Sequence, residues 1–399
     1  MKKLYISIFL VQIAGLGFAQ TAYITNYHDN TVSVINIATN TVTATITVGT
    51  HPFGISVSPD GSKVYVANCA DTGTVSVINT ATNTVLDTIA VGKFPFGVSV
   101  SPDGTMVYVG NGSDGTVSVI NTATNIVSAT ITGFSYPEGV SVSPDGLRVY
   151  VANGTSTVSV INSATNIVSN TITVGAVPQG ISVSPDGSKV YVTNRNSNTV
   201  SVINTATDTV SATITVGSFP NAISISPDGL MVYVANEYSN TVSVINSTTN
   251  TVSATIPVGA VPEGISVSPD GSKVYVVNTG DETVNVMNTA TNTVTDTIAV
   301  GQGPVSFGNF ISSYGTGIAS VSVESSCINV YPNPAKNKIT IECPRQATLE
   351  ILNVQGQIIK TIYTADKQTS IDVRNLSSGV YIIKAKTERG VAVKKFIRE

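Results

Sequence analysis

Short runs of alternating β-branched and small polar residues fill the chain from residue 22 to residue 311. One stretch contains GISVS at 54–58, KVYVAN at 63–68, TVSVIN at 74–79 and TVLDTIAVG at 84–92. Alternation with a two-residue period predicts β-strands, and turn-forming residues separate the runs. No stretch of ten or more residues after the N-terminus has helical periodicity. We therefore predict an all-β protein.

The four runs recur as one unit. The asparagines that end the VIN phrase are 41 to 43 residues apart, and they are Asn36, Asn79, Asn121, Asn162, Asn204, Asn246 and Asn288. Four strands repeated with a period of about 42 residues are typical of a propeller blade. Seven copies predict a seven-bladed β-propeller over residues 20–311.

The turn between the first and second strands, SPDG, occurs six times, one fewer than the VIN phrase. The first unit begins directly with AYITN at 22–26, which matches a second strand, while GPVSFGNFI at 303–311 matches a first strand. We therefore expect 303–311 to pair with 22–26, so that strands from the two ends of the repeat region close the ring. Closure removes the exposed sheet edges that promote aggregation.

The second strands carry a further phrase, YVTN at 191–194, with the variants YITN, YVAN, YVGN and YVVN in the other copies. On these motifs the chain resembles the YVTN β-propeller repeat family over about residues 22–311. Members of that family include exported and surface-layer proteins, so the resemblance implies a location more than a chemistry.

The N-terminus, MKKLYISIFLVQIAGLGFAQ, places two lysines before an apolar run and small residues. This pattern predicts a secretory signal peptide over residues 1–19, cleaved between Ala19 and Gln20. A membrane anchor is the alternative, but the run is shorter than about 18 residues and no basic cluster follows it. Nothing later in the sequence resembles a membrane span, so we expect an exported protein with no transmembrane segment after cleavage.

The composition changes after residues 312–326, a Ser/Gly-rich segment that is predicted to be a linker. Residues 20–326 carry 6 basic and 18 acidic side chains, whereas residues 327–399 carry 12 and 6. Alternating runs in 327–399 predict a small antiparallel, immunoglobulin-like β-sandwich. The acidic first domain would repel phosphate backbones, so nucleic-acid binding is not expected.

Four motifs stand in order in this second domain: VYPNP, NVQGQ, LSSGVYIIK and VKKFI. They closely resemble the type A C-terminal sorting domain of the type IX secretion system. The resemblance implies that the type IX machinery recognises 327–399, that the protein is released or attached at the outer surface, and that its source is a Bacteroidetes-like bacterium.

The chain has three cysteines, Cys69, Cys327 and Cys343. The last two flank one predicted strand segment and could form a disulfide, but sequence spacing cannot establish the geometry, so the bonded and free forms both stay open. No CxxC pair supports a structural zinc site.

The loops of a four-stranded antiparallel blade alternate between the two faces of the ring. SPDG and NTATN turns are nearly invariant among the copies, and we interpret the SPDG aspartates as turn residues, not as calcium ligands. The loops of the other face differ from copy to copy, and loops on a rigid scaffold commonly carry binding sites. The candidate ligand-binding residues on this variable face are Phe53, Phe96, Glu138, Gln179, Asn221, Glu263, His28, His51, Phe94, Tyr136, Phe219 and Tyr238.

Aromatic rings beside carboxylates suit stacking on a sugar ring or a peptide, although such rings can also simply fill gaps between blades. Glu138 and Glu263 stand three blades apart across the channel mouth and are weak candidates for a shared cation. His28 and His51 are expected to be exposed loop residues. There is no GxSxG, HExxH, P-loop or EF-hand motif, so no catalytic residue is assigned.

These observations favour a secreted or cell-surface, non-catalytic binding or adhesion module without a cofactor. Its ligand would be an extracellular glycan or protein. The alternative is a lactonase-like or lyase-like propeller enzyme with a metal at the channel mouth.

Overall fold

The computed structural model describes residues 20–312, 329–342, 347–352, 358–364, 367–387 and 390–399. The predicted signal peptide with Ala19, residues 313–326 of the predicted linker, and both Cys327 and Cys343 lie outside these ranges. The chain divides into two compact units, Met1–Gly317 and Ile318–Glu399. Among the described residues there are strands and one short 3₁₀ turn, so the prediction of an all-β protein is confirmed.

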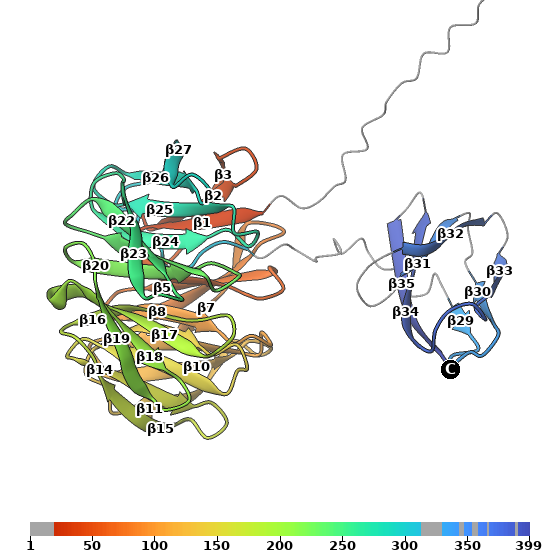
Figure 1. The fold of residues 1–399 in the computed structure, drawn as a ribbon, viewed down its shortest axis with the longest axis horizontal. Coiled ribbons are helices and arrows are strands. Elements are labelled where there is room, and N and C mark those ends of the chain that lie inside the picture. Colours follow the sequence, from red (N-terminus) through yellow and green to blue (C-terminus); the bar gives the residue numbers. More distant parts are fainter. Residues whose placement is uncertain (1–19, 313–328, 343–346, 353–357, 365–366, 388–389) are drawn as a thin grey trace, which may run out of the picture. The chain divides into compact units, whose positions relative to one another are not determined.

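The first unit consists of seven antiparallel sheets, which are the blades of a β-propeller (Figure 1). Blade 1 contains β1 (Thr21–Asn26), β2 (Thr31–Asn36) and β3 (Thr41–Thr47). Blade 2 contains β4 (Pro52–Val57), β5 (Lys63–Asn68), β6 (Thr74–Asn79) and β7 (Thr84–Ala90). Blade 3 contains β8 (Pro95–Val100), β9 (Met106–Asn111), β10 (Thr116–Asn121) and β11 (Ile126–Thr132).

The remaining blades repeat this order of strands. Blade 4 contains β12 (Pro137–Val142), β13 (Arg148–Asn153), β14 (Thr157–Asn162) and β15 (Ile167–Thr173). Blade 5 contains β16 (Pro178–Val183), β17 (Lys189–Asn194), the 3₁₀ turn η1 (Arg195–Ser197), β18 (Thr199–Asn204) and β19 (Thr209–Thr215). Blade 6 contains β20 (Pro220–Ile225), β21 (Met231–Asn236), β22 (Thr241–Asn246) and β23 (Thr251–Pro257). Blade 7 contains β24 (Pro262–Val267), β25 (Lys273–Asn278), β26 (Thr283–Asn288) and β27 (Thr293–Ala299).

Residues 303–312 lie along the inner edge of blade 1. The amide of Tyr23 donates to the carbonyl of Phe310 at 2.9 Å, and the amide of Val305 donates to the carbonyl of Thr25 at 3.0 Å. Antiparallel bridges join Ala22 to Ile311 and Asn26 to Pro304. This segment therefore occupies the first-strand position of blade 1, which is the pairing that the missing SPDG turn predicts.

The same segment also pairs with the neighbouring blade, which the sequence did not predict. Its central part, β28 (Phe307–Asn309), runs parallel to β4 of blade 2, with Phe307 opposite Gly54. Blade 7 contacts blade 1 as well, because the Lys273 ammonium donates to the carbonyl of Ile37 at 3.1 Å. The two ends of the repeat region are thus held together by backbone and side-chain hydrogen bonds.

The YVTN-type phrase forms a joint between blades. Its asparagine closes each second strand, and the Asn194 amide donates to the hydroxyls of Thr199 at 3.0 Å and Ser201 at 2.9 Å on the third strand. A Cβ on Gly175, at the end of the preceding blade, would lie only 2.6 Å from Cγ of Asn194. Because only glycine fits there, the glycine and the asparagine set the close approach of consecutive blades.

The SPDG turns are closed by their own side chains. In the turn of blade 5, the Ser184 hydroxyl donates to Asp186 at 2.6 Å, and the amide of Ser188 donates to the same carboxylate at 3.0 Å. These hydrogen bonds lower the pKa of Asp186 to about 2. Gly187 follows with φ of 72°, a conformation that glycine adopts without strain. Each of these contacts agrees with the interpretation of the aspartate as a turn residue.

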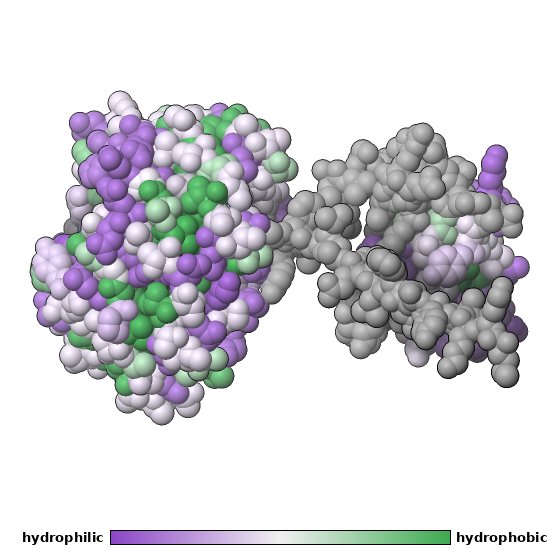
Figure 2. All heavy atoms as spheres, turned by 90° about the horizontal axis from the view of Figure 1, so that it is seen from above, coloured by the Kyte–Doolittle hydropathy of each residue, from purple (hydrophilic) through white to green (hydrophobic). Residues whose placement is uncertain are grey.

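Exposed apolar side chains are scattered over the propeller, including Leu86, Ile126, Leu147 and Ile167. On the face shown in Figure 2, hydrophobic residues form small groups separated by hydrophilic ones. Isolated surface residues of this kind are normal in soluble proteins. On this face, therefore, no large continuous apolar patch marks a binding surface.

The second unit contains two antiparallel sheets. One consists of β29 (Asn329–Tyr331), β30 (Lys338–Glu342) and β33 (Gln368–Asp372), and the other of β32 (Ile358–Thr364), β31 (Ala347–Leu352), β34 (Gly379–Thr387) and β35 (Gly390–Arg398). Ile339 and Ile371 of the first sheet share one core with Leu349, Ile383 and Phe396 of the second. The predicted sandwich is therefore confirmed. The run 328–342 was expected to be one strand segment and is two, because prolines at 332 and 334 cannot donate to a sheet ladder.

No helix among the described residues is long and apolar enough to span a membrane. Cys69 is buried and free, and burial raises the pKa of its thiol to about 12.

Candidate functional site at the channel mouth

Each first strand begins at a proline, and the residue before that proline has an unusual backbone conformation. His51, Phe94, Tyr136, Val177, Phe219 and Val261 all have φ between 49° and 56°, and Gly303 has φ of 61°. Positive φ is costly for bulky residues and persists only where the surrounding fold imposes it. Because the feature recurs in every blade, it belongs to the scaffold. It turns the chain sharply into the channel and fixes the residue that follows the proline.

Aromatic rings occupy one side of this mouth. Phe53 and Phe96 stand edge to face with their centroids 5.2 Å apart, and Phe96 is 5.6 Å from Tyr136. Below them Phe53 is 5.9 Å from Phe307 of the closing segment. Phe53 and Phe96 are half-buried and Tyr136 is exposed, so their faces remain partly open to a ligand. We call Phe53, Phe96 and Tyr136 the aromatic arc.

Polar side chains occupy the other side. The Gln179 amide donates to the Glu138 carboxylate at 2.6 Å. Arg195 and Glu237, from the loops of blades 5 and 6, form an ion pair at 3.0 Å, and the Asn221 amide donates to Glu237 at 3.4 Å. We call Glu138, Gln179, Asn221, Glu237, Arg195 and Glu263 the polar arc.

The electrostatics of the polar arc are unusual for surface carboxylates. Burial raises the pKa of Glu138 to about 7, against the opposing effects of the Gln179 hydrogen bond and of the Arg195 charge. Burial also raises the pKa of Glu263 to about 7, and the negative charge of Glu237 adds to that rise. Arg195 acts on both carboxyl groups, so Glu138 and Glu263 belong to one electrostatic cluster. With a pKa of about 7, each of these carboxyl groups is partly protonated at neutral pH.

A second aromatic group lies beside the ion pair. Phe219 and Tyr238 are stacked with centroids 4.1 Å apart, and the Arg195 guanidinium lies 4.9 Å from the centre of the Phe219 ring. This cation–π contact and the Glu237 pair hold Arg195 in a defined position. Tyr238 is 62% exposed and forms the outer surface of this group.

The other candidates lie apart from the two arcs. Tyr27 stacks on His51 at 4.4 Å and meets His28 edge-on at 5.2 Å, so a tyrosine ring contacts both histidines. His28 is exposed, as the sequence predicted, whereas His51 is half-buried. Phe94 is half-buried and has no ring contact among the described residues. Phe134, another aromatic residue of these connections, is buried in a core between blades, where it fills a gap.

Sequence reasoning missed Arg195, Glu237 and Phe307. Arg195 and Glu237 are the first residues of the variable loops RNSN and EYSN. Opposite charges at the same loop position of two neighbouring blades could have indicated an ion pair. Among the described residues no group of three or more His, Cys, Asp and Glu side chains is arranged to hold a metal ion. The shared cation between Glu138 and Glu263 stays a weak hypothesis.

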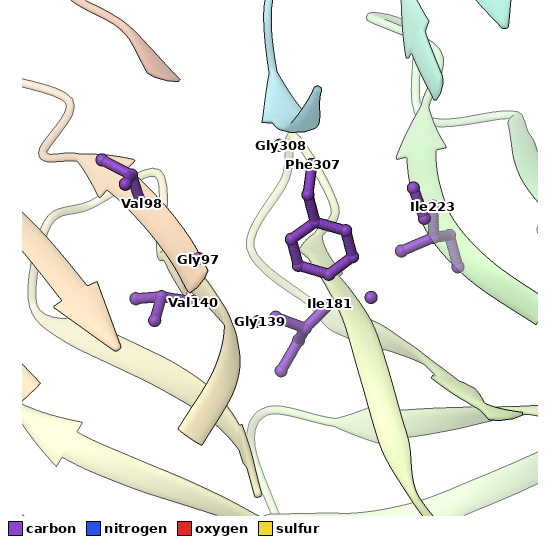
Figure 3. Close-up of a pocket in the computed structure, with 10 residues that line it drawn as sticks. Gly97, Val98, Gly139, Val140, Ile181, Ile223, Phe307 and Gly308 are labelled. Carbon is purple, nitrogen blue, oxygen red and sulfur yellow. The ribbon is translucent and has the colours of Figure 1, made fainter. Parts of the chain in front are cut away.

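The channel narrows to a waist beneath the mouth. The waist is a cavity of about 30 Å³ bounded by Val98, Val140, Ile181, Ile223 and Phe307. Figure 3 shows the Phe307 ring between the side that carries Val98 and Val140 and the side that carries Ile223. Other blades have valine or isoleucine where the closing segment has Phe307, so this one larger ring narrows the passage.

Beyond the waist the channel widens into a cavity of about 560 Å³ at the opposite, uniform face. All seven blades line it, and six serines stand at equivalent positions of their first strands: Ser56, Ser99, Ser141, Ser182, Ser224 and Ser266. This cavity therefore lies on the face whose turns the sequence predicted to be scaffold.

Comparison with protein families agrees with this architecture. The family described as "Secretion system C-terminal sorting domain" matches residues 329–399. The family "Lactonase, 7-bladed beta-propeller" matches residues 121–213, 166–253 and 204–306, and "YNCE-like beta-propeller" matches residues 61–156. The chain is thus a β-propeller protein with a C-terminal sorting domain of the type IX secretion system. A sorting domain of this kind supports export to the cell surface or the medium.

No curated protein matches the sequence. Among solved structures, the hydrazine synthase of Kuenenia stuttgartiensis is 23% identical, with a TM-score of 0.62 over 72% of this chain and 99% of that one. A putative 6-phosphogluconolactonase from Bacteroides uniformis is 20% identical, with a TM-score of 0.63 over 72% and 98%. A functionally unknown protein from Desulfotomaculum acetoxidans is 18% identical, with a TM-score of 0.64 over 73% and 99%. At these identities the similarity establishes a shared fold alone.

Proposed function

We propose that the propeller is an exported, non-catalytic binding module and that its ligand sits at the variable mouth of the channel. The observation that carries this proposal is the division of one rim into an aromatic arc and a polar arc. A ligand with an apolar face and several hydrogen-bond donors fits both arcs at once. Extracellular glycans and protein loops both have this character.

Each arc would make its own kind of contact. Phe53, Phe96 and Tyr136 offer ring faces for stacking, which contributes beyond simple area burial. In the polar arc, the Oε1 atom of Gln179 is buried and has no hydrogen-bond partner among the described residues. Because an unpaired buried acceptor costs free energy, a ligand donor at that position would gain affinity. The rigid blades hold these groups in place before binding, which lowers the entropic cost.

The test is binding of the full chain to glycan and extracellular-matrix arrays, followed by affinity measurements on any hit. Phe53→Ala/Phe96→Ala is expected to lower affinity at least tenfold. Phe94→Ala is the matched control, because it removes a ring of the same type from the same kind of connection outside the arc. Equal affinity of the double variant and the control would place the ligand elsewhere.

A lactonase-like activity is the second candidate. The family match over residues 121–306 supports it, and so does the pKa of about 7 for Glu138 and Glu263, which suits a general acid or base at neutral pH. Turnover of a lactone panel by the full chain, lost in Glu138→Gln/Glu263→Gln, would replace the binding proposal. No turnover in the presence of added divalent cations would remove this candidate.

The route of export also belongs to the proposal. Residues 1–19 would direct the chain to the periplasm as a signal peptide, and the sorting domain would then direct it through the outer membrane. The adhesive part of the function is the propeller, and the C-terminal unit serves transport.

A further inference from the structure

The cavity on the uniform face has a distinct chemistry. Its floor is the apolar waist, with Val98, Val140, Ile181 and Ile223 shared between the two spaces. Its wall is the ring of six serines, completed in blade 1 by Asn309, and its rim includes Pro59, Pro185, Pro227 and Pro269. A volume of about 560 Å³ is within the usual range of small-ligand sites.

Among the described residues, five of the six serine hydroxyls have a free hydrogen-bond donor, and the sixth, Ser266, donates to Asn309 at 3.3 Å. Ser99 and Ser141 accept hydrogen bonds from the backbone amides of Val142 at 3.2 Å and Val183 at 3.3 Å in the next blades. Ser56 and Ser224 accept in the same way, and among the described residues none of these four hydroxyls donates in return. The hydroxyl of the half-buried Ser182 makes no hydrogen bond to the described residues. The wall therefore offers several hydroxyl donors directed by the fold.

Charged ligands do not suit this cavity. None of its lining side chains is ionisable. A charged group would lose its hydration without gaining a counter-charge, and that loss costs several kcal/mol. The six SPDG turns of the uniform face carry aspartates whose pKa values are lowered by their hydrogen bonds. These aspartates are ionised and would repel anions from the entrance of the cavity (Asp60, Asp103, Asp145, Asp186, Asp228 and Asp270).

The cavity is also closed at its inner end. The waist leaves only about 30 Å³, which is room for little more than water. A polymer cannot thread through such a passage, so only the end of a chain can enter. Hydroxyl donors on the wall and apolar side chains on the floor match the hydroxyls and C–H faces of sugar units.

We propose that this cavity is a second binding site, separate from the variable mouth, which takes the free end of a neutral oligosaccharide. Two or three sugar units fill it. The serine hydroxyls bond to the sugar oxygens, and the Val/Ile floor packs against the terminal ring. The site does not depend on the aromatic arc or the polar arc, so it stands or fails independently of the function proposed above.

The experiment measures binding of defined saccharides to the full chain by saturation-transfer NMR and calorimetry. The probes are maltotriose and cellotriose as neutral chain ends, α-cyclodextrin as a neutral saccharide with no end, and trigalacturonic acid as an anionic trimer. We expect a linear neutral trimer to bind and the cyclic and anionic probes to bind at least tenfold more weakly. Binding of none of the linear neutral trimers, which would mean a cavity filled by water only, would overturn the proposal.

Variants assign the site. Ser182→Ala removes a hydroxyl that no chain atom uses, so folding is retained and Kd should rise about three- to tenfold, the effect of one neutral hydrogen bond. Ser182→Leu replaces the hydroxyl by a larger apolar side chain at the cavity wall and should weaken binding more than Ser182→Ala does. Phe53→Ala/Phe96→Ala at the other mouth should leave it unchanged. If saccharide binding is lost in the phenylalanine variant and retained in Ser182→Leu, the saccharide binds at the variable mouth, and the proposal of a second site is refuted.

Discussion

Replacing Glu263 by glutamine tests the electrostatics of the polar arc directly. Burial and the nearby Glu237 raise the pKa of the Glu263 carboxyl from 4.5 to about 7. The folded protein therefore holds this proton more tightly than the unfolded chain does between these two pH values. Between pH 4.5 and about 7 the unfolded chain releases this proton while the folded protein retains it, so the free energy of unfolding falls as the pH rises across this window and stays lowered above it. Below about pH 4.5 both states are protonated and the penalty is absent.

The magnitude follows from the two pKa values. The interval from 4.5 to about 7, at about 1.4 kcal/mol for each pKa unit, corresponds to about 3 kcal/mol. Glutamine resembles the protonated carboxyl and cannot ionise. Glu263→Gln should therefore stabilise the propeller by up to about 3 kcal/mol at pH 8.5 and by close to nothing at pH 4.5. In a domain of this size, the shift in Tm at pH 8.5 is about 6 °C.

The assay is thermal and urea unfolding of the full chain, followed by far-UV circular dichroism at both pH values. Glu282→Gln is the matched control, because Glu282 lies in an exposed loop of the same blade. A stabilisation by Glu263→Gln that is equal at pH 4.5 and pH 8.5 would refute the reasoning, since no ionisation would then be involved. Destabilisation at pH 8.5 would mean that the ionised carboxylate has a favourable partner in the folded chain.

Four further predictions concern the fold, the ion pair and the export route. A chain that ends at Val300 lacks the segment beside β1 and should unfold at a lower temperature than one that ends at Ser312; equal Tm values would contradict the closure. Gly175→Ala, whose Cβ would lie 2.6 Å from Asn194, should cost about 3 kcal/mol in urea unfolding, against about 1 kcal/mol for Gly61→Ala, which meets no atom within 4 Å but has positive φ. Arg195→Ala leaves Glu237 buried without its partner and should cost about 3 kcal/mol, largely restored by adding Glu237→Gln; additive effects in the double-variant cycle would show no coupling. Deleting the last ten residues in the native host should trap the protein in the periplasm, and normal arrival of this truncation at the surface or in the medium would show that the sorting domain is dispensable.

The propeller could be predicted because each blade repeats the same order of strands and turns along the sequence. Strand alternation, the 41-to-43-residue spacing and the count of SPDG turns specify the blades and the pairing of 303–311 with 22–26. At six of the seven blade joints the glycine and the asparagine have local signals too, since only glycine tolerates the approach of the next blade; at the joint of blades 3 and 4, Phe134 takes the glycine position. The parallel pairing of β28 with β4 had no such signal. It joins first strands of two different blades, and a linear sequence does not show how close these strands come in the closed ring.

The candidate site was predictable only in part. Residues after the proline of each first strand were identified because they vary among otherwise identical copies, and Phe53 and Glu138 belong to this set. The Arg195–Glu237 pair joins loops of two different blades, and its contact depends on the η1 turn and on the left-handed conformation of Asn198 that follows it. The rise in the pKa of Glu263 depends on burial, and a sequence does not show how deeply a loop carboxylate lies.

The cavity of the uniform face shows why comparing the copies can hide a site as well as reveal one. Variation among repeats marks a position where one blade differs from the others, which suits an asymmetric ligand held by a few unlike side chains. A ring of equivalent serines is different, because six of the seven copies contribute the same hydroxyl and the cavity forms only when all blades are assembled. In a single repeat, such a serine is interpreted as a structural residue. It does have a structural role, since the Ser99 hydroxyl accepts a hydrogen bond from the backbone amide of Val142 in the next blade. Repetition of one serine among the blades therefore builds a neutral, hydroxyl-lined cavity on the channel axis. At the opposite face, the residues that differ among the blades are charged and aromatic.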